Sequence, residues 1–258
     1  MGTPRVNSLT KKRVLVTAGT QGIGRQITVR LLEAGCKVAV HYFSTEVNIE
    51  VLASEAGVDA SQIKLIQGDL RNKEQAQAVV ATALDFLGGM DVLVNNAGSL
   101  IGRRRVEELE EDFWRDSVDL NLSSVLWVTQ AATPALTAAG SSSIVNLASL
   151  AGRKGGHAGS LAYSTMKGAV LTWTRALANE LGPKGVRVNA VAPGLILGTS
   201  FHNTHTTKES ADETVLGIPL GRAGDADDVA RVVLFLASEH SGFVTGATID
   251  VNGGVYGS

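Results

Sequence analysis

A tyrosine and a lysine four positions apart are the residues of this chain whose types and spacing best suit proton transfer. Tyr163 and Lys167 lie at residues 160–182, where apolar side chains recur every three or four positions, as in a helix with one buried face. Residues four apart are neighbours on a helix. A cation beside a phenol favours the phenolate. The pair predicts a hydroxyl that transfers protons near neutral pH, although a solvated helix face is the commoner reason for such a pair alone.

The composition is that of an ordinary globular protein with a large core. The chain has 258 residues, of which 44% are hydrophobic and 19% charged, and its formal net charge is -2. Nucleic-acid-binding domains are usually basic, so we expect no nucleic acid partner. The sequence lacks an apolar run long enough for a membrane span or a signal peptide, and its single cysteine cannot form an internal disulfide. We therefore expect a cytoplasmic protein without membrane contact.

A glycine-rich turn between a strand and a helix is the first sign of phosphate binding. Residues 12–17 form a valine-rich run typical of a buried strand, and residues 25–34 have the apolar spacing of a helix. Three glycines lie between them, within residues 18–24. Such a unit offers backbone N–H groups and a helix N-terminus to a phosphate.

The alternation of strands and helices continues to the end of the chain and predicts a parallel sheet with helices on both faces. We expect a single-domain α/β protein, residues 1–258, with a doubly wound, Rossmann-type sheet and a flexible N-terminal tail at residues 1–11. The further strands are expected at residues 37–42, 63–67, 91–95, 143–147, 187–191 and 248–251, and the helices at 46–56, 73–87, 107–138, 160–182 and 226–237.

A polar segment interrupts this pattern near the C-terminal third. Residues 199–210, TSFHNTHTTKES, have no hydrophobic period and follow the carboxyl end of a predicted strand, where ligands bind in open parallel sheets. They are either a mobile lid or a plain surface loop. His202 and His205 lack a third ligand at suitable spacing, so we expect no metal site.

The chain resembles the short-chain dehydrogenase/reductase family from residue 12 to residue 254. The order and spacing of several motifs carry this resemblance. They are TAGTQGIG at 17–24, NNAG at 95–98, the serine at 149, YSTMK at 163–167, the Pro-Gly pair at 193–194 and DVNGG at 250–254.

The resemblance implies roles for four residues in a reaction that interconverts a ketone and a secondary alcohol. Tyr163 would be the acid and base, and Lys167 would lower its pKa and hold the nicotinamide ribose. Ser149 would hydrogen-bond the substrate oxygen. Asn121 would anchor a water-mediated proton relay to the lysine. Hydride transfer builds charge on one oxygen, so donors must already be in place around it.

The resemblance also implies the residues that contact the dinucleotide, among which Asp69 would bind the adenine amine. The implied contacts are Gly19, Thr20, Gln21, Gly22, Ile23, Gly24, Ser44, Thr45, Asp69, Leu70, Asn95, Ala97, Gly98, Tyr163, Lys167, Pro193, Gly194, Ile196 and Thr199.

The end of the second predicted strand favours NADP(H) over NAD(H). An acidic residue there would bind the ribose of NAD and repel a 2′-phosphate, but this chain has no carboxylate before Glu46. Ser44 and Thr45 offer hydroxyl donors to the phosphate. The arginine that NADP-using relatives often carry is absent at Gln21 and at Phe43, so NAD(H) stays the alternative.

The chain departs from the family pattern at three places. Ala18 stands where a glycine is usual, which would shift the pyrophosphate loop. Ser149 and Tyr163 are 14 residues apart, one more than is commonest, so we expect the intervening loop to bulge. Gly198 stands where a threonine is frequent, and Thr199 would replace it.

The resemblance points to 3-oxoacyl-(acyl-carrier-protein) reductases and to sugar or polyol dehydrogenases. The substrate would be a small-molecule or carrier-bound carbonyl compound, and relatives of this length are commonly homotetramers. A non-catalytic redox sensor is the alternative of another class, although such relatives generally lose the tyrosine or the lysine. Three arginines at 103–105 either bind an acidic substrate or carrier or begin a solvated helix.

Overall fold

A parallel sheet organises the structure and presents one edge to a ligand. In the computed structural model, which describes residues 8–199 and 207–257, seven strands pair in the order β3-β2-β1-β4-β5-β6-β7. The order reverses between β1 and β4, and ligands bind in the crevice at the carboxyl ends of such strands. The strands are β1 (Arg13–Val16), β2 (Lys37–Tyr42), β3 (Ile63–Gln67), β4 (Val92–Asn95), β5 (Ser142–Leu147), β6 (Val186–Pro193) and β7 (Thr248–Val251).

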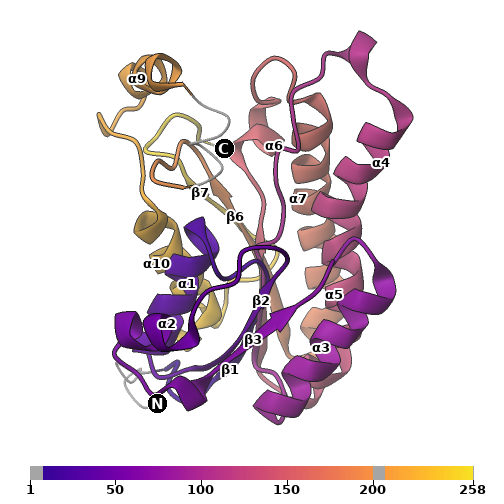
Figure 1. Ribbon diagram of the computed structural model, residues 1–258, viewed down its shortest axis with the longest axis vertical. Helices are drawn as coiled ribbons and strands as arrows, with labels where there is room; N and C mark the ends of the chain where they lie inside the picture. The colour runs from indigo at the N-terminus through magenta and orange to yellow at the C-terminus, as the bar shows by residue number, and fades with distance from the viewer. Residues whose placement is uncertain (1–7, 200–206, 258) are drawn as a thin grey trace.

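Helices cover both faces of the sheet, which confirms the predicted fold class (Figure 1). α1, α2 and α10 lie on one face, and α3, α4, α5 and α7 lie on the other, whereas α6 and α9 stand beyond the carboxyl edge. Their bounds are α1 (Gly22–Glu33), α2 (Ile49–Ala56), α3 (Lys73–Leu87), α4 (Glu111–Val118), α5 (Ser124–Ala138), α6 (Leu150–Lys154), α7 (Leu161–Leu181), α9 (Lys208–Leu216) and α10 (Ala226–Ala237).

The two faces of the sheet have separate cores, which explains why the strands read as unbroken apolar runs. Successive side chains of a strand point to opposite faces. Val14 and Val16 therefore join the core under α1 and α10, whereas Leu15 joins the core under α3, α5 and α7. All three side chains are fully buried. A strand buried on both faces shows no alternation of apolar and polar residues.

The long helical stretch predicted from about 107 to 138 is largely confirmed, but a π-helical turn interrupts it and divides it into several elements. Asn121 sits at the break, where its side-chain amide donates to the carbonyl oxygens of Ser99 and Ser117 at 3.0 and 3.1 Å. A one-turn π-helix at such a place often marks a functional site. The elements are the 3₁₀ turn η2 (Val106–Glu108), α4, the π-helix η3 (Asp119–Ser123) and α5.

The polar segment at 199–210 contains the start of a helix, which its lack of hydrophobic period did not predict. α9 begins after Thr207, whose hydroxyl accepts a hydrogen bond from the backbone N–H of Ser210. Lys208 and Asp212 form an ion pair one turn apart. Only one residue of α9 is buried. A capping hydrogen bond and an ion pair stabilise this helix, so its sequence has no apolar stripe from which the helix could be predicted.

Two further expectations lie partly outside the described residues. The lid or surface loop falls largely on residues 200–206, together with His202 and His205. The expected tail falls on residues 1–7 and a short stretch that follows. In that stretch Leu9 is buried in the core, so this part belongs to the folded domain.

Candidate active site

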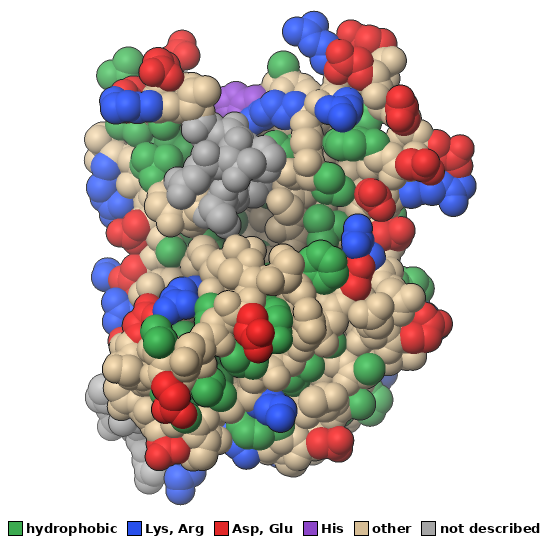
Figure 2. Space-filling model, in the orientation of Figure 1, with side chains coloured by type: hydrophobic (Ala, Val, Ile, Leu, Met, Phe, Trp, Pro, Cys, Tyr) green, Lys and Arg blue, Asp and Glu red, His purple; other side chains and the backbone are tan. Residues whose placement is uncertain are grey.

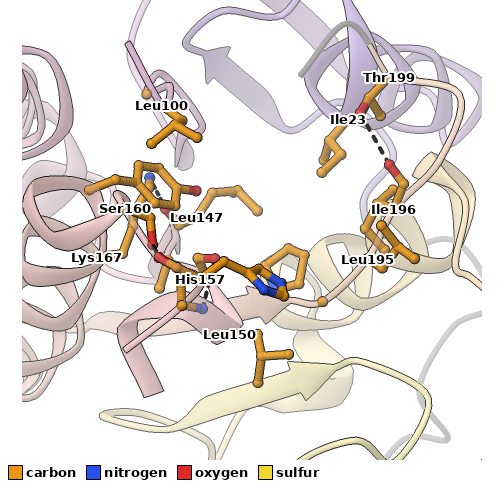
Figure 3. Close-up of a pocket in the computed structure, with 18 of the residues that line it drawn as sticks. Ile23, Leu100, Leu147, Leu150, His157, Ser160, Lys167, Leu195, Ile196 and Thr199 are labelled. Carbon is orange, nitrogen blue, oxygen red and sulfur yellow. Dashed lines mark hydrogen bonds between the residues drawn. The ribbon is translucent and has the colours of Figure 1, made fainter. Parts of the chain in front are cut away.

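A cavity of about 870 Å³ lies at the carboxyl edge of the sheet (Figure 3). Its walls come from the turn after β1, the loop after β4, α6, the first turns of α7, the end of β6 and α9. Its volume falls in the range usual for sites that enclose a small molecule or cofactor. Ser149, Tyr163 and Lys167 all line it.

The turn after β1 is held in place by buried hydrogen bonds. Thr17 Oγ1 accepts from the backbone N–H groups of Asn96 and Ala97, each at 2.9 Å. Asn96 Nδ2 donates to the carbonyl oxygens of Thr17 and Ala18, each at 3.0 Å. Ala18 itself has a left-handed φ of 49°, which costs an L-residue about 1–2 kcal/mol and suits glycine better. The replacement of the family's usual glycine by Ala18 therefore places a strained backbone conformation in this turn.

His41 also supports this turn, although the sequence did not single it out. Its Nδ1 accepts the backbone N–H of Ala18 at 3.0 Å, and its Nε2 lies 3.0 Å from the carbonyl oxygen of Gly68. Burial lowers the pKa of His41. The neutral ring therefore carries its proton on Nε2 and donates to Gly68. A histidine within an apolar strand was the only sequence signal for this role.

The start of α1 fits the phosphates of a dinucleotide. Its N-cap residue, Gln21, makes no side-chain capping bond, and the first turn carries no acid. The N–H groups at this end and the helix dipole favour an anion. A Cβ at Gly24 would lie 2.1 Å from the carbonyl oxygen of Ala18, so only glycine allows the helix to start this close to the turn.

Ser149 caps a short helix that packs on the lysine-bearing helix. Its Oγ accepts the backbone N–H of Ala151 at 3.1 Å, at the start of α6. The expected bulge between Ser149 and Tyr163 therefore contains a helix. α6 packs directly on α7, since a Cβ at Gly152 would lie 2.6 Å from the carbonyl carbon of Lys167.

The other end of α6 is tied to the edge strand β7. Arg153 forms a two-pronged ion pair with Asp250, at 3.1 and 3.2 Å, and both side chains are largely buried. Breaking such a pair from one side leaves an uncompensated charge. Arg153 thus fixes the helix that carries Ser149.

Lys167 is buried, whereas Tyr163 is partly exposed to the cavity, and removal from bulk water dominates the protonation of both. Burial raises the pKa of Tyr163 to about 12, and a hydrogen bond with the side chain of Ser149 partly opposes the rise. Burial lowers the pKa of Lys167 from 10.5 to about 8. Lys167 Nζ lies 5.8 Å from the centre of the Tyr163 ring and donates to the carbonyl oxygen of Leu147 at 2.8 Å. The role expected for Lys167, lowering the pKa of Tyr163, therefore stays a prediction.

Asn121 approaches the lysine from the opposite side. Its Oδ1 accepts the backbone N–H of Ser99 at 3.0 Å. A Cβ at Gly98 would lie 2.8 Å from Asn121 Oδ1 and 2.9 Å from Lys167 Nζ. Asn121 Oδ1 and Lys167 Nζ therefore both lie close to Gly98, and a side chain at this position would collide with both. Asn121 does not itself line the cavity.

The predicted site residues divide into a group that lines the cavity and a group that supports it. The lining group is Gln21, Gly22, Ile23, Gly24, Gly98, Ser149, Tyr163, Lys167, Pro193, Gly194, Ile196 and Thr199. The predicted residues outside the lining are Gly19, Thr20, Ser44, Thr45, Asp69, Leu70, Asn95, Ala97 and Asn121. Asn95, for example, donates from a buried amide to Thr129 and Asn146 within the core.

The expected adenine end of the site carries an ion pair. Asp69 Oδ1 accepts from Arg71 Nε at 3.0 Å and Asp69 Oδ2 from Arg71 Nη2 at 2.7 Å, and this bonding lowers the pKa of Asp69. Leu70 is buried beside it. The Arg71 guanidinium also lies 5.5 Å from the centre of the Phe43 ring. Phe43 and Arg71 thus form an exposed, basic flank next to the end of β2.

The end of β2 presents hydroxyl groups and one nearby carboxylate. Thr45 Oγ1 lies 3.4 Å from Gln21 Oε1, so the loop after β2 meets the start of α1. Ser44 and Thr45 are exposed. Burial and the neighbouring Glu46 carboxylate raise the pKa of Tyr42. Glu46 therefore lies beside Tyr42 at the end of β2.

Two basic residues of the cavity lining, Lys154 and His157, were not predicted as site residues, whereas Arg103 belongs to the arginine run already considered for an acidic substrate. Arg103, Lys154 and His157 all line the cavity. The sequence offered two signals, the arginine run at 103–105 and the extra residue between Ser149 and Tyr163.

The fold and the cavity define a class of protein. A doubly wound sheet whose switch point opens on a helix N-terminus, with a serine, a tyrosine and a lysine in the same cavity, is the arrangement of a nicotinamide-dependent oxidoreductase. In the described parts of the chain we find no helix with the length and apolarity needed to cross a bilayer.

Comparisons with known proteins agree with this class. The family model described as Enoyl-(Acyl carrier protein) reductase matches residues 17–256. The 3-oxoacyl-(acyl-carrier-protein) reductase FabG of Staphylococcus aureus (strain Mu50) is 36% identical over 245 residues, which cover 95% of this chain and 98% of that protein. The acetoacetyl-CoA reductase of Shinella zoogloeoides is 36% identical over 242 residues, covering 94% and 97%.

Solved structures with the same fold include sugar-related enzymes. The NADH-dependent reductase A1-R′, responsible for alginate metabolism, has a TM-score of 0.88 and 30% identity, over 98% of this chain and 100% of that one. The glucose/ribitol dehydrogenase of Brucella melitensis has a TM-score of 0.87 and 36% identity, over 96% and 98%. The chain belongs to the short-chain dehydrogenase/reductase family, whose members are oxidoreductases that bind NAD(P)(H).

The buried lysine predicts a pH-dependent stability. Since the pKa of Lys167 falls from 10.5 to about 8 on folding, the unfolded chain binds the proton more tightly between these values. Stability should therefore rise with pH across this window, by up to about 1.4 kcal/mol per pH unit. Lys167→Met should abolish the rise, as measured by urea unfolding between about pH 8 and 10.

Lys64→Met is the control, because Lys64 is exposed on β3. It should follow the pH dependence of the unmodified protein. A constant difference between the unmodified protein and Lys167→Met across the window would contradict the shifted pKa.

Proposed function

We propose that this protein interconverts a ketone and a secondary alcohol with NADP(H), using Tyr163 as the acid and base. The observation that carries the proposal is the meeting of Ser149, Tyr163 and Lys167 in the cavity into which α1 opens. Bound nicotinamide supplies or accepts the hydride. Tyr163 donates the proton to the carbonyl oxygen, so that one C–H and one O–H bond form as the C=O double bond becomes single.

The neighbouring groups prepare Tyr163 for this step. Ser149 already shares a hydrogen bond with Tyr163, so an oxygen placed beside both hydroxyls receives two donors. Lys167 stands one helical turn away and positions the ribose, while Asn121 and Gly98 hold the lysine from behind. We assign Lys167 and Asn121 as positioning residues and as the start of the proton path.

Two carbonyl substrates are candidates. A 3-oxoacyl group on a carrier protein or on coenzyme A is suggested by the names of the relatives, a 3-oxoacyl-(acyl-carrier-protein) reductase and an acetoacetyl-CoA reductase. A sugar or polyol is favoured by the alginate-metabolism reductase and the glucose/ribitol dehydrogenase among the solved structures. The polar side chains at the mouth of the cavity support the second candidate.

Tyr163→Phe should keep dinucleotide binding and lower turnover at least about a hundredfold, the scale expected when a positioned general acid is lost. Turnover is followed by NADPH absorbance with a panel of ketones, and binding by NADPH fluorescence. Tyr256→Phe is the matched control, because Tyr256 does not line the cavity.

Turnover near that of the unmodified protein in Tyr163→Phe would refute the assignment of the acid. Binding of the dinucleotide without turnover on any ketone, in the unmodified protein, would instead favour a redox sensor.

The proposed preference for NADP(H) rests on the end of β2. Ser44 and Thr45 are exposed hydroxyl donors, and Thr45 reaches the start of α1 at Gln21. Neutral donors stabilise a phosphate less than a bidentate arginine does. Glu46 lies near Tyr42, and its carboxylate would repel the 2′-phosphate to some extent. The preference should therefore be modest.

We expect NADPH to be favoured over NADH by about ten- to thirtyfold in kcat/KM. Tyr42→Asp should reverse the order, because it places a carboxylate at the end of β2, whereas Glu46→Gln should increase the preference. Initial rates with each dinucleotide measure the ratio. If the unmodified protein prefers NADH, Ser44 and Thr45 do not face the ribose phosphate.

We further propose a homotetramer built through α10 and the edge strand β7. Phe235 on α10 and Phe243 before β7 expose 40% and 105% of their surface, so both offer apolar area to a partner subunit. Sedimentation at micromolar protein should give about four times the chain mass. A mass near 26.9 kDa, that of one chain, would contradict the assembly.

A further inference from the structure

One end of the cavity carries a cluster of basic side chains that the proton chemistry does not use. We call Arg103, Lys154 and His157 the basic rim. The cavity lining holds three lysine or arginine side chains, counting Lys167, against one carboxylate, Glu213. The whole chain, by contrast, has a net charge of -2. Positive charge is thus concentrated at the cavity.

The rim is built from two loops that are fastened together. The backbone N–H of Arg104 donates to the carbonyl oxygen of Gly159 at 2.9 Å, and Arg103 Nη1 donates to that of Ala158 at 3.2 Å. Ser160 Oγ donates to the carbonyl oxygen of His157 at 2.6 Å. The rim is therefore joined to the residues just before Tyr163.

The imidazole of His157 points into the cavity. Figure 3 shows it between the wall that carries Ser160 and Lys167 and the wall that carries Leu195 and Ile196. In the space-filling view, basic side chains and a histidine gather on the same upper part of the molecule (Figure 2).

Lys154 differs from its neighbour Arg153 in having its charge available. Arg153 is neutralised by Asp250. Lys154 is exposed, and it takes part in none of the ion pairs that join described residues. It lies five positions after Ser149, about 8 Å along a helix. An anion at the rim is thus a few carbon atoms from an oxygen held by Ser149.

The facing wall, from α9, is also polar. It contributes the hydroxyl groups of Thr207, Ser210 and Thr214, together with the Glu213 carboxylate. These hydroxyl groups are exposed or half-buried and can donate to and accept from the hydroxyl groups of a substrate, which an alkyl chain cannot do.

We propose that the substrate is a small carbonyl compound that carries its own carboxylate, and that Arg103 and Lys154 bind this carboxylate. This inference rests on the proposed function and names the substrate class of the same cavity. Arginine and lysine bind carboxylate and phosphate alike, so a phosphate-bearing carrier such as coenzyme A is the competing source of the anion. The short span from the rim to Ser149 favours the carboxylate, because the pantetheine arm separates a carrier phosphate from its thioester by much more.

Matched substrates separate these sources. 5-Keto-D-gluconate carries a carboxylate four carbon atoms from its ketone, D-fructose is a neutral ketose of the same length, and acetoacetyl-CoA carries its phosphates on the carrier. We expect the acid to be reduced with a kcat/KM at least about tenfold above that of D-fructose, as one charge-assisted contact predicts. Higher kcat/KM for acetoacetyl-CoA, or equal values for acid and neutral ketose, would overturn the proposal.

Two variants and a control locate the effect. Arg103→Met and Lys154→Met should each raise KM for the acid about tenfold, leave kcat nearly unchanged and spare D-fructose. Arg105→Met is the control, because Arg105 belongs to the same arginine run but does not line the cavity. If the variants lose kcat/KM equally for the acid and for D-fructose, the assignment of Arg103 and Lys154 as carboxylate-binding residues is wrong.

A binding measurement tests the rim independently of turnover. Calorimetry with D-gluconate and D-sorbitol, in the presence of NADPH, should show tighter binding of the acid and about tenfold weakening in both rim variants. If no carbonyl compound is reduced but D-gluconate binds in this way, the proposed function fails, whereas carboxylate binding by the basic rim is supported. If the rim variants bind D-gluconate as tightly as the unmodified protein does, Arg103 and Lys154 do not bind the carboxylate.

Discussion

The buried ammonium group of Lys167 is the constraint on which the site depends. It is 3% exposed, and its hydrogen bond to the Leu147 carbonyl ties α7 to the end of β5. A buried charge is costly unless its surroundings bond it. Gly98, from the loop after β4, and Asn121, from η3, lie close to it. The position of Tyr163, one turn earlier on α7, follows from this anchoring.

Short helices and loops then complete the catalytic half of the cavity. α6 lies on the backbone of Lys167, and Arg153 ties it to β7 through Asp250. The serine that caps α6 is thereby held against the tyrosine of α7. The same helix ends at Lys154, which faces the cavity mouth. One five-residue helix thus links the reacting hydroxyls to the group that would select an acidic substrate.

The phosphate-binding half is organised differently, by neutral hydrogen bonds. Thr17, Asn96 and the neutral His41 satisfy the backbone around the turn after β1. Because these groups carry no charge, the field at the start of α1 is set by the helix itself. An anion there meets no competing carboxylate in the first turn. Under the proposed function, the two halves would divide the work, with proton transfer on one side of the sheet's switch point and phosphate binding on the other.

The sequence by itself determined the doubly wound sheet, because apolar strands alternating with amphipathic helices have few other ways to bury both faces. Its motifs also identified Ser149, Tyr163 and Lys167, which do line one cavity. The π-helix at Asn121 and the orientation of the Lys167 amine were decided by the tertiary structure. These features depend on contacts between distant segments, namely Asn121 with Ser99, 22 positions apart, and Lys167 with Leu147, 20 positions apart, which no local period records. The pKa of Tyr163 belongs with them, because desolvation is a property of the assembled core and not of a neighbour four residues away.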